Sequence, residues 1–554
     1  MMFDAVTAEL LRSAPEVPGL DSDDLPALLT KHYTELAAAR LRGAGESDTD
    51  DITGQWSLDR IADTYELIAS LDERREARLP SAFVAATAQQ IVARKELAVS
   101  PQDEGRANID RDHVDPAVAA TVLFLIAEQY ADANEAAMAV RIESDAQLYE
   151  ATILTENIVD LSKGQLASIM GRAERWRKAN AQQLTIEERA LAALLETLVA
   201  GIELLAAQLL QMEAPGVAGR FGGSQDAFRR VLVLATAGHG RGTLANRKAV
   251  PAYSGPHHLA SLLLAASDSL LKSSLLLVPP PTGADPVIWM NWLRFRAEKF
   301  PYLWPNHRTA IEKGFHETGV SSVVVLPTGA GKTTVSSLKI AGVLAQKKKV
   351  VFLAPTHALV DQLTEDLQEM FPSELFGSNV SSDFDLLFME EAIFQDIEVM
   401  TPERCLTMLS FAPEAFEEVG LLVFDECHLL NAQGKLRRAL DGMLCILGFC
   451  HIVPSADLLL LSAMLNNGEE LARWLRQLTG RTSVAVDLVW KPSRQARGVI
   501  IYNESELAES IANAEQVQRR ENREKKVVQR AFGLQRPANW SPFLRRYGAY
   551  SITG

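Results

Sequence analysis

The stretch VVVLPTGAGKTT, residues 323–334, decides the fold of the part of the chain around it. Its β-branched residues predict a strand over 323–327, and a helical stretch follows the Gly-rich turn. Gly329 and Gly331 let backbone N–H groups curl around phosphate groups, where side chains would collide. The order of strand, turn and helix therefore predicts a phosphate-binding loop.

The side chains of this loop suit ATP and Mg²⁺. We expect Lys332 to reach the β- and γ-phosphates and the Thr333 hydroxyl to bind Mg²⁺. The helix that begins near Lys332 directs its positive end at the same anion. The general pattern opens with Gly, where this chain has Leu326, so the alternative is a Gly-rich turn with an incidental Gly-Lys-Thr. The residues predicted to bind ATP are Pro327, Thr328, Gly329, Ala330, Gly331, Lys332, Thr333 and Thr334.

An acidic pair follows a second apolar run, LLVFDECH at 421–428. In a parallel sheet such a strand delivers Asp425 to the carboxyl end, where ligands bind. Asp425 is expected to hold Mg²⁺ through its water shell, and Glu426 to orient and deprotonate the attacking water. The alternative is a solvent-facing acidic turn after a core strand. We predict Lys332, Asp425 and Glu426 as catalytic residues and Thr333 and Asp425 as metal-binding residues.

Short apolar runs alternate with helical stretches through this part of the chain, which predicts a parallel sheet wrapped on both faces. We therefore predict a RecA-like α/β domain over 287–478. The runs are 323–327, 350–355, 397–402, 421–426 and 458–463.

The chain before this domain reads as mostly α-helical. Apolar residues recur at helical spacing, and Thr185 with Glu188 three residues later is a capping box. We predict a helical region over 1–280 and a Pro-rich linker at 278–286.

Residues 479–554 are predicted to begin a second lobe or to form a C-terminal extension. Strands are expected at 483–490 and 497–503, and a polar helix over about 504–530. The basic stretch 519–546 has two interpretations, a phosphate contact or a solvated helix face.

Composition sets outer limits on function. With 554 residues, 47% of them hydrophobic and 23% charged, the chain is typical of a globular protein of two or three domains. A formal net charge of −16 argues against coating DNA by bulk electrostatics, but a motor needs only a local basic track. Four cysteines indicate a reducing, cytoplasmic setting. Cys427, Cys445 and Cys450 suggest either buried thiols or a zinc site, whose usual paired spacing is absent.

One stretch, 190–212, is apolar enough to span a bilayer, although Glu196 and Glu203 lie within it. A buried helix is the favoured interpretation, and no membrane association is expected. The first twenty residues lack the apolar segment of a signal peptide.

The pairing of PTGAGKT with DECH resembles the superfamily 2 helicases of the DExH type, and three further segments agree in order. LAPTHALVDQ at 353–362 resembles motif Ia, TPER at 401–404 motif Ib, and LSAM at 461–464 motif III. LSAMLNNGEELARWL at 461–475 is similar to the Ski-like branch of DNA-repair and RNA-processing helicases. The resemblance covers about 170 residues, and residues 1–280 lie outside it.

The resemblance implies roles for particular residues. His307, in WPNHRTAI at 304–311, stands where the family usually has an adenine-binding Gln, and Met464 stands where motif III usually has Thr. His428, Ser462 and Ala463 would couple the ATP site to the nucleic acid. The residues implied to grip the backbone of a single strand are Pro355, Thr356, His357, Thr401, Pro402 and Arg404.

The resemblance implies an ATP-dependent helicase or translocase that uses ATP and Mg²⁺ and acts on a single strand, with DNA favoured over RNA. In this family a second RecA-like domain carries motif VI, whose arginine completes the ATP site. No such motif is found after Leu475, so we expect a half-motor that hydrolyses ATP poorly alone. The helical region is expected to dock protein partners, as in an antiviral defence or repair system. The alternatives are an ATP-operated switch that does not translocate and an interaction scaffold.

Overall fold

The computed structural model describes residues 25–42, 56–72, 74–99, 108–142, 148–177, 185–217, 219–237, 250–376, 380–381, 394–430, 436–488, 490–492, 512–513 and 516–520. The chain divides into two compact units, Met1–Ser493 and Arg494–Gly554. In the second unit the described residues are helical. The predicted strand at 497–503 and most of the basic stretch lie outside the described residues.

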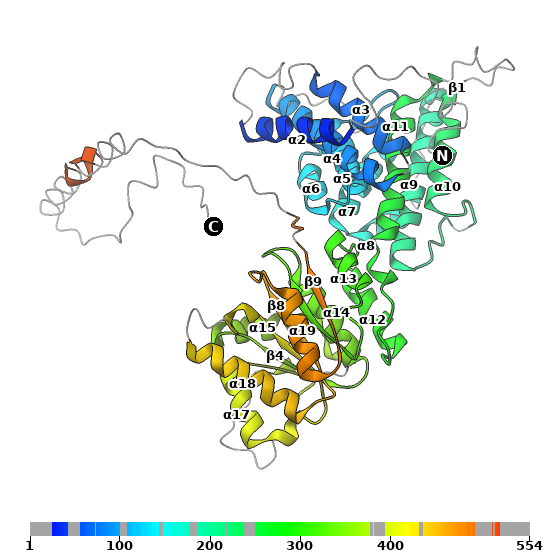
Figure 1. Cartoon of the computed structure of the whole chain (residues 1–554). Helices are drawn as coiled ribbons and strands as arrows, with labels where there is room; N and C mark the ends of the chain where they lie inside the picture. Colours follow the sequence, from blue (N-terminus) through cyan, green and yellow to red (C-terminus); the bar gives the residue numbers. More distant parts are fainter. Residues whose placement is uncertain are drawn as a thin grey trace, which may run out of the picture. The chain divides into compact units, whose positions relative to one another are not determined.

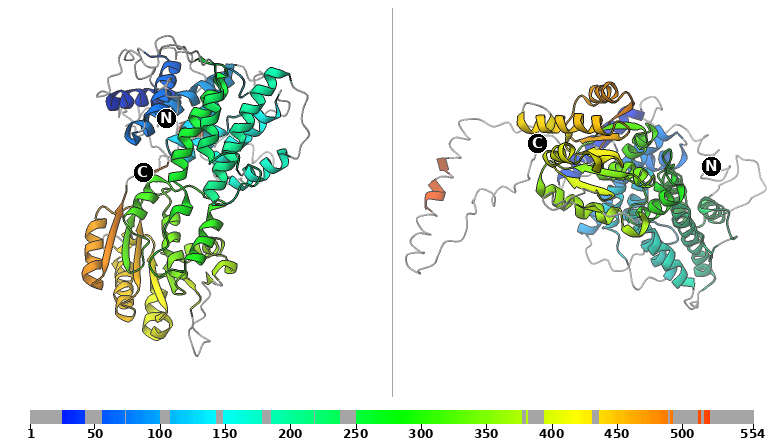
Figure 2. Two further views of the ribbon diagram at one scale, coloured as in Figure 1. Left: turned by 90° about the vertical axis from the view of Figure 1, so that its right-hand side faces the viewer. Right: turned by 90° about the horizontal axis from the view of Figure 1, so that it is seen from below.

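The first part of the larger unit is built from helices, as predicted (Figure 1). Helices α9, α10 and α11 pack side by side, and α5 packs against α4, α6 and α11 (Figure 2). Every residue of α5 is buried, so this helix lies at the centre of the helical core. The helices are α2 (Leu25–Arg42), α3 (Leu58–Leu71), α4 (Arg75–Val99), α5 (Pro116–Ile126), α6 (Tyr130–Ala137), α7 (Tyr149–Lys163), α8 (Leu166–Arg177), α9 (Ile186–Leu210), α10 (Ser224–Leu234) and α11 (Ser254–Lys272), with a two-stranded antiparallel sheet of β1 (Thr236–Ala237) and β2 (Val250–Pro251).

Helix α9 contains the apolar stretch singled out in the sequence. The Thr185 side chain accepts from the Glu188 N–H and the Glu188 carboxylate accepts from the Thr185 N–H, so the predicted capping box forms. Among the described residues one helical segment, Glu188–Leu210, is long and apolar enough to cross a membrane, and 72% of its most apolar window is buried inside the protein. Glu196 pairs with Arg220 at 3.2 Å. Packing against other helices accounts for the apolar character of α9.

A seven-stranded parallel sheet follows, in the order β5-β6-β4-β7-β8-β3-β9. This confirms the predicted α/β architecture. The strands are β3 (Val320–Val325), β4 (Lys349–Leu353), β5 (Val380–Ser381), β6 (Ile397–Met400), β7 (Val419–Phe424), β8 (Asp457–Ser462) and β9 (Thr482–Asp487).

Helices cover both faces of this sheet. Neighbouring residues of one strand, such as Val323 and Val324, belong to different apolar clusters, because successive side chains point to opposite faces. The cluster that contains Val324 continues into the helical region, so the two parts share one core. The helices are α12 (Pro286–Ala297), α13 (Pro305–Glu312), α14 (Lys332–Leu344), α15 (His357–Met370), α16 (Ser373–Phe376), α17 (Pro402–Phe411), α18 (Leu436–Ile452) and α19 (Gly468–Thr479).

Strand β9 corrects the predicted end of the α/β domain at 478. It pairs in parallel with β3 from Val320↔Thr482 to Val325↔Asp487, so the sheet continues to residue 487. The strand expected to open a second lobe is instead an edge strand of this sheet, because the chain after α19 returns beside β3.

The Pro-rich segment 278–286 is packed against the α/β domain and is not a free linker. The Trp289 indole donates to the Val278 carbonyl at 3.0 Å, and the Gln346 amide donates to the Thr282 carbonyl at 2.6 Å. A Cβ added at Gly342 would lie 2.5 Å from the ring of Pro281, which shows how closely α14 approaches the segment. The segment lies within the compact unit Met1–Ser493, together with the parts of the chain on either side of it.

A buried ion network ties the strands together at the end opposite the phosphate-binding loop. The Lys339 ammonium donates to the carbonyls of Glu317 and Val320 at 2.8 and 2.7 Å and lies 3.5 Å from Asp457. Arg481 donates to the other oxygen of Asp457 at 2.8 Å. Burial lowers the pKa of Lys339 to about 8. The network fixes the starts of β3 and β8.

Candidate nucleotide site

The phosphate-binding loop spans the gap between β3 and α14. Gly329 and Gly331 have φ of 79° and 81°, in the left-handed region that favours glycine. The Ala330 N–H donates to the Pro327 carbonyl at 3.0 Å, which closes the turn. Lys332 is the first residue of α14, so its backbone lies at the positive end of the helix.

Two side chains of α13 support the loop from beneath. The Asn306 amide donates to the Ala330 carbonyl at 2.7 Å, and Nε2 of His307 lies 3.3 Å from the same oxygen. The His307 ring stacks on Trp304 at 5.2 Å with an interplanar angle of 15°. A Cβ added at Gly331 would lie 2.3 Å from Nε2 of His307, so this close approach requires glycine.

His307 does not lie where a side chain that binds adenine would be expected, at an accessible surface. Its side chain is buried, and burial lowers the pKa of His307 to about 4, so the imidazole is neutral near pH 7. A neutral ring that donates from Nε2 to the Ala330 carbonyl holds the loop and does not face solvent. The contact of Asn306 with the phosphate-binding loop was not predicted from the sequence. The position of Asn306 next to His307 in the chain was the sequence feature that could have indicated it.

The acidic residues follow β7 at the same edge of the sheet. The Asp425 N–H donates to the Leu353 carbonyl at 3.0 Å, and its carboxylate accepts from the Glu426 N–H at 2.9 Å. Burial raises the pKa of Asp425, while the nearby Lys332 ammonium opposes this shift. A carboxylate must be ionised to bind Mg²⁺, which burial of Asp425 disfavours and the Lys332 ammonium favours.

Glu426 faces the phosphate-binding loop. It has φ of 53°, an uncommon conformation for a residue other than glycine. The Lys332 ammonium donates to Oε1 of Glu426 at 2.8 Å, so this strained turn places a carboxylate opposite the lysine. The structure therefore brings together Lys332, Asp425 and Glu426, the three residues predicted to be catalytic.

A chain of polar contacts continues from Glu426 to the end of β8. Nδ1 of His428 lies 3.1 Å from Oε2 of Glu426 and 3.4 Å from Oγ of Ser462. The Ser462 hydroxyl accepts from the Met464 N–H at 3.1 Å. Two of the predicted coupling residues, His428 and Ser462, thus connect the lysine of the loop to the residue that follows Ala463.

The six residues predicted to grip a nucleic-acid backbone follow two neighbouring strands, β4 and β6, at the same sheet edge. Thr356 and His357 are exposed, and Pro355 and Arg404 are partly buried. Thr401 and Pro402 are buried, and the Thr401 hydroxyl accepts from the Arg404 N–H as the N-cap of α17. Thr401 and Pro402 shape the turn, which leaves the other four side chains accessible.

The residues present fit Mg²⁺ bound together with ATP. Mg²⁺ usually keeps several waters and takes one or two protein ligands plus substrate phosphates, which matches Thr333 and Asp425. Within the described residues no group of three or more His, Cys, Asp or Glu side chains is arranged to hold a metal. Cys427 and Cys445 are buried thiols of the core.

The model of the DEAD/DEAH box helicase family matches residues 304–471. These residues carry the phosphate-binding loop, the acidic pair and the end of β8. The chain contains a DEAD/DEAH box helicase domain of superfamily 2.

Curated relatives agree over the same part of the chain. The ATP-dependent DNA helicase Hel308 of Thermococcus kodakarensis is 30% identical over 199 residues, which is 36% of this chain and 16% of that protein. The Hachiman protein HamB of Bacillus cereus is 27% identical over 186 residues, 32% of this chain and 16% of that protein. The matched helicase domain is therefore a small part of these longer proteins.

Among solved structures, the DUF1998 helicase MrfA bound to DNA is similar at 23% identity over 38% of this chain and 30% of that protein. The TM-score is 0.30.

Proposed function

We propose that this protein is an ATP-dependent helicase or translocase that acts on single-stranded nucleic acid. The observation that carries the proposal is the path of contacts from Lys332 through Glu426 and His428 to Ser462. This path begins at the phosphate-binding loop and ends at the sheet edge that bears Thr356 and Arg404. A change at the ATP site can therefore reach the end of β8 through direct contacts, at the same sheet edge as the proposed nucleic-acid side chains.

Lys332 and Glu426 exchange partners in this mechanism. The Lys332 ammonium donates to the Glu426 carboxylate at 2.8 Å. When ATP binds, the phosphates take over Lys332 and release Glu426, which then orients the attacking water and accepts its proton. Thr333 and Asp425 would hold Mg²⁺, which would supply charge neutralisation for the phosphates. Release of Glu426 also changes the partner of His428, and this change reaches Ser462.

The nucleic acid is DNA in this proposal, because the first relatives are described as DNA helicases. Similarity to the Hachiman protein HamB supports a role in defence. The helical region supplies the surface for protein partners, and the protein acts in the cytoplasm. Thr356, His357 and Arg404 contact the sugar–phosphate backbone, so binding is independent of sequence.

Binding of labelled single strands tests the choice of nucleic acid. Fluorescence anisotropy with oligonucleotides of one sequence as DNA and as RNA should show tighter binding of DNA, which weakens with salt and with Arg404→Ala. Tighter binding of RNA would overturn the DNA assignment. Binding of neither strand would overturn the nucleic-acid function.

A second candidate, an ATP-operated switch without translocation, is favoured by Met464. This residue stands in the motif III position usually held by Thr, and it is 72% exposed. A thioether cannot make the hydrogen bonds of a hydroxyl, so one link between hydrolysis and movement is weakened. Strand displacement driven by ATP favours the motor, whereas ATP-dependent binding without displacement favours the switch.

A further inference from the structure

Helix α13 contacts two different parts of the molecule. Asn306 and His307 hold the Ala330 carbonyl of the phosphate-binding loop, at 2.7 and 3.3 Å. Arg308, the next residue, instead contacts the helical region, where it donates to the Ser273 hydroxyl at 3.0 Å. One short helix thus joins the nucleotide loop to the helical region.

The second partner of Arg308 is Glu128, a carboxylate in the turn between α5 and α6. The Glu128 side chain is 3% exposed and that of Arg308 is 13% exposed, so water screens this ion pair little. Arg75 of α4 donates to the same carboxylate at 2.7 Å. Because Glu128 is buried, removal of a cationic partner leaves a poorly compensated charge.

The segment that leads into α13 is also bound to the helical region. The Leu303 N–H donates to the Ser273 carbonyl at 2.7 Å, and the Tyr302 hydroxyl donates to the Leu161 carbonyl at 2.8 Å. The Tyr302 ring stacks on Tyr130 at 5.0 Å. The residue before Trp304 is therefore fixed in place by α7, α6 and the end of α11.

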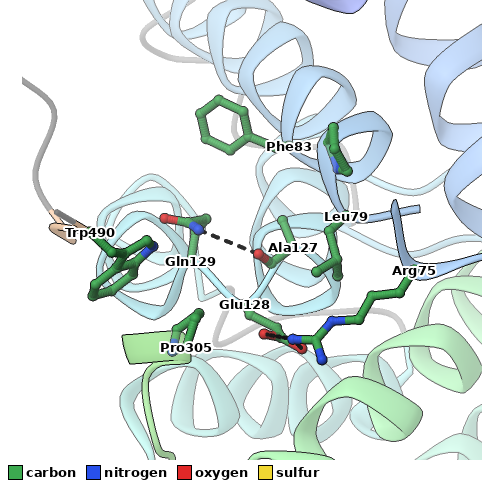
Figure 3. Close-up of a pocket in the computed structure, with 9 residues that line it drawn as sticks. Arg75, Leu79, Phe83, Ala127, Glu128, Gln129, Pro305 and Trp490 are labelled. Carbon is green, nitrogen blue, oxygen red and sulfur yellow. Dashed lines mark hydrogen bonds and ion pairs between the residues drawn. The ribbon is translucent and has the colours of Figure 1, made fainter. Parts of the chain in front are cut away.

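A cavity of about 320 Å³ adjoins these contacts, with Arg75, Glu128, Pro305 and Trp490 among its lining residues. Figure 3 shows the Arg75 guanidinium against the Glu128 carboxylate, with Pro305 and Trp490 together at one side. The Trp490 ring lies 5.6 Å from Trp304. The pocket thus borders both the Glu128 carboxylate and Pro305, the first residue of α13.

We propose that the helical region positions the nucleotide loop through α13, with Glu128 and Arg308 as positioning residues. The path runs from Glu128 to Arg308, along α13 to Asn306 and His307, and from these to Ala330. The inference rests on the proposed binding of ATP at this loop. Since coupling is reciprocal, a partner that binds the helical region and shifts α13 changes nucleotide affinity, and nucleotide changes affinity for that partner.

The test compares nucleotide affinity in full-length variants. Arg308→Met and Glu128→Gln remove the ion pair, and Arg308→Lys keeps the charge. Arg78→Met is the matched control, because Arg78 is also 13% exposed and pairs with Asp268 at 2.7 Å, between α4 and α11 of the helical region. The dissociation constant of a fluorescent ATP analogue is measured with Mg²⁺, and thermal unfolding of each variant is recorded beside it.

Arg308→Met and Glu128→Gln should each weaken analogue binding by about fivefold or more, the lower end of typical coupling between sites. Arg308→Lys should restore part of the affinity, and Arg78→Met should bind as wild type does even if its melting temperature falls. If Arg308→Met does not fold, Glu128→Gln decides, because its side chain keeps the shape of the original.

If the Arg308→Met and Glu128→Gln proteins fold and bind the analogue with wild-type affinity, this inference is overturned but the proposed ATP function is not. An equal loss of affinity in Arg78→Met would also overturn it, because the effect would then follow general destabilisation. A wild-type protein that binds no analogue would overturn the proposed ATP function itself, and the inference with it.

Discussion

The ion pair between Lys332 and Glu426 predicts that the substitution Glu426→Gln affects nucleotide binding and turnover differently. The ion pair at 2.8 Å engages the lysine that ATP needs, so Glu426 and the phosphates compete for Lys332. Glutamine keeps the size of the side chain but removes its charge. The substitution should therefore leave nucleotide binding intact or tighten it, while it abolishes the proposed base.

The geometry sets the magnitude of both effects. The two side chains are 19% and 29% exposed, so solvent weakens the pair, and exposed pairs are worth about 0.2–1 kcal/mol. Loss of a competitor of that strength tightens nucleotide binding by about fivefold at most. Loss of a general base lowers turnover by about 10²- to 10⁴-fold.

The assay measures the dissociation constant of a fluorescent ATP analogue and the rate of phosphate release in Glu426→Gln, with Lys332→Ala beside it. Lys332→Ala should lose both binding and turnover, whereas Glu426→Gln should lose turnover only. The reasoning is refuted if Glu426→Gln weakens binding as much as Lys332→Ala, or if it keeps turnover within tenfold of wild type.

Three further perturbations address other parts of the structure. Asp457→Asn should lower the free energy of unfolding by about 3–5 kcal/mol, because it leaves the buried Lys339 ammonium without its counter-charge. Chemical denaturation measures this loss of stability, and a loss no larger than that for an exposed ion pair would contradict the prediction. Burial lowers the pKa of His258 but the adjacent Glu66 carboxylate raises it, and the net direction is up. The stability that this pair contributes should be complete below pH 6.5 and decline as the pH rises through the raised pKa. Thermal melts across pH should show this decline in the wild type and not in His258→Gln. Gly331→Ala, at φ of 81° and with its Cβ 2.3 Å from a buried imidazole, should abolish analogue binding while circular dichroism stays unchanged.

Features set by local chemistry could be predicted from the sequence. The loop at 327–334 follows from the spacing of Gly329 and Gly331 between a β-branched run and a helix. The parallel sheet follows from repeated short apolar strands separated by helices. The helix start at Thr401 was also readable, since Thr followed by Pro and Glu is an N-terminal signal, but the resemblance assigned those residues to a nucleic-acid contact.

Features set by distant contacts could not be predicted. Strand β9 joins the sheet because it pairs with β3, far away in the sequence, and its own residues do not specify that partner. Arg308 and Glu128 are 180 residues apart, and neither lies in a recognisable motif. The burial of His307 likewise depends on how α13 packs under the loop, which one segment alone does not reveal.

The most direct test of the account is ATP turnover by the full chain with and without single-stranded DNA, beside Lys332→Ala. The path from Lys332 to Ser462 and the sheet edge beyond predicts that DNA raises turnover in the wild type and that Lys332→Ala is inactive in both conditions. Turnover that DNA does not change, or that survives in Lys332→Ala, would contradict the claim that this site drives a nucleic-acid motor.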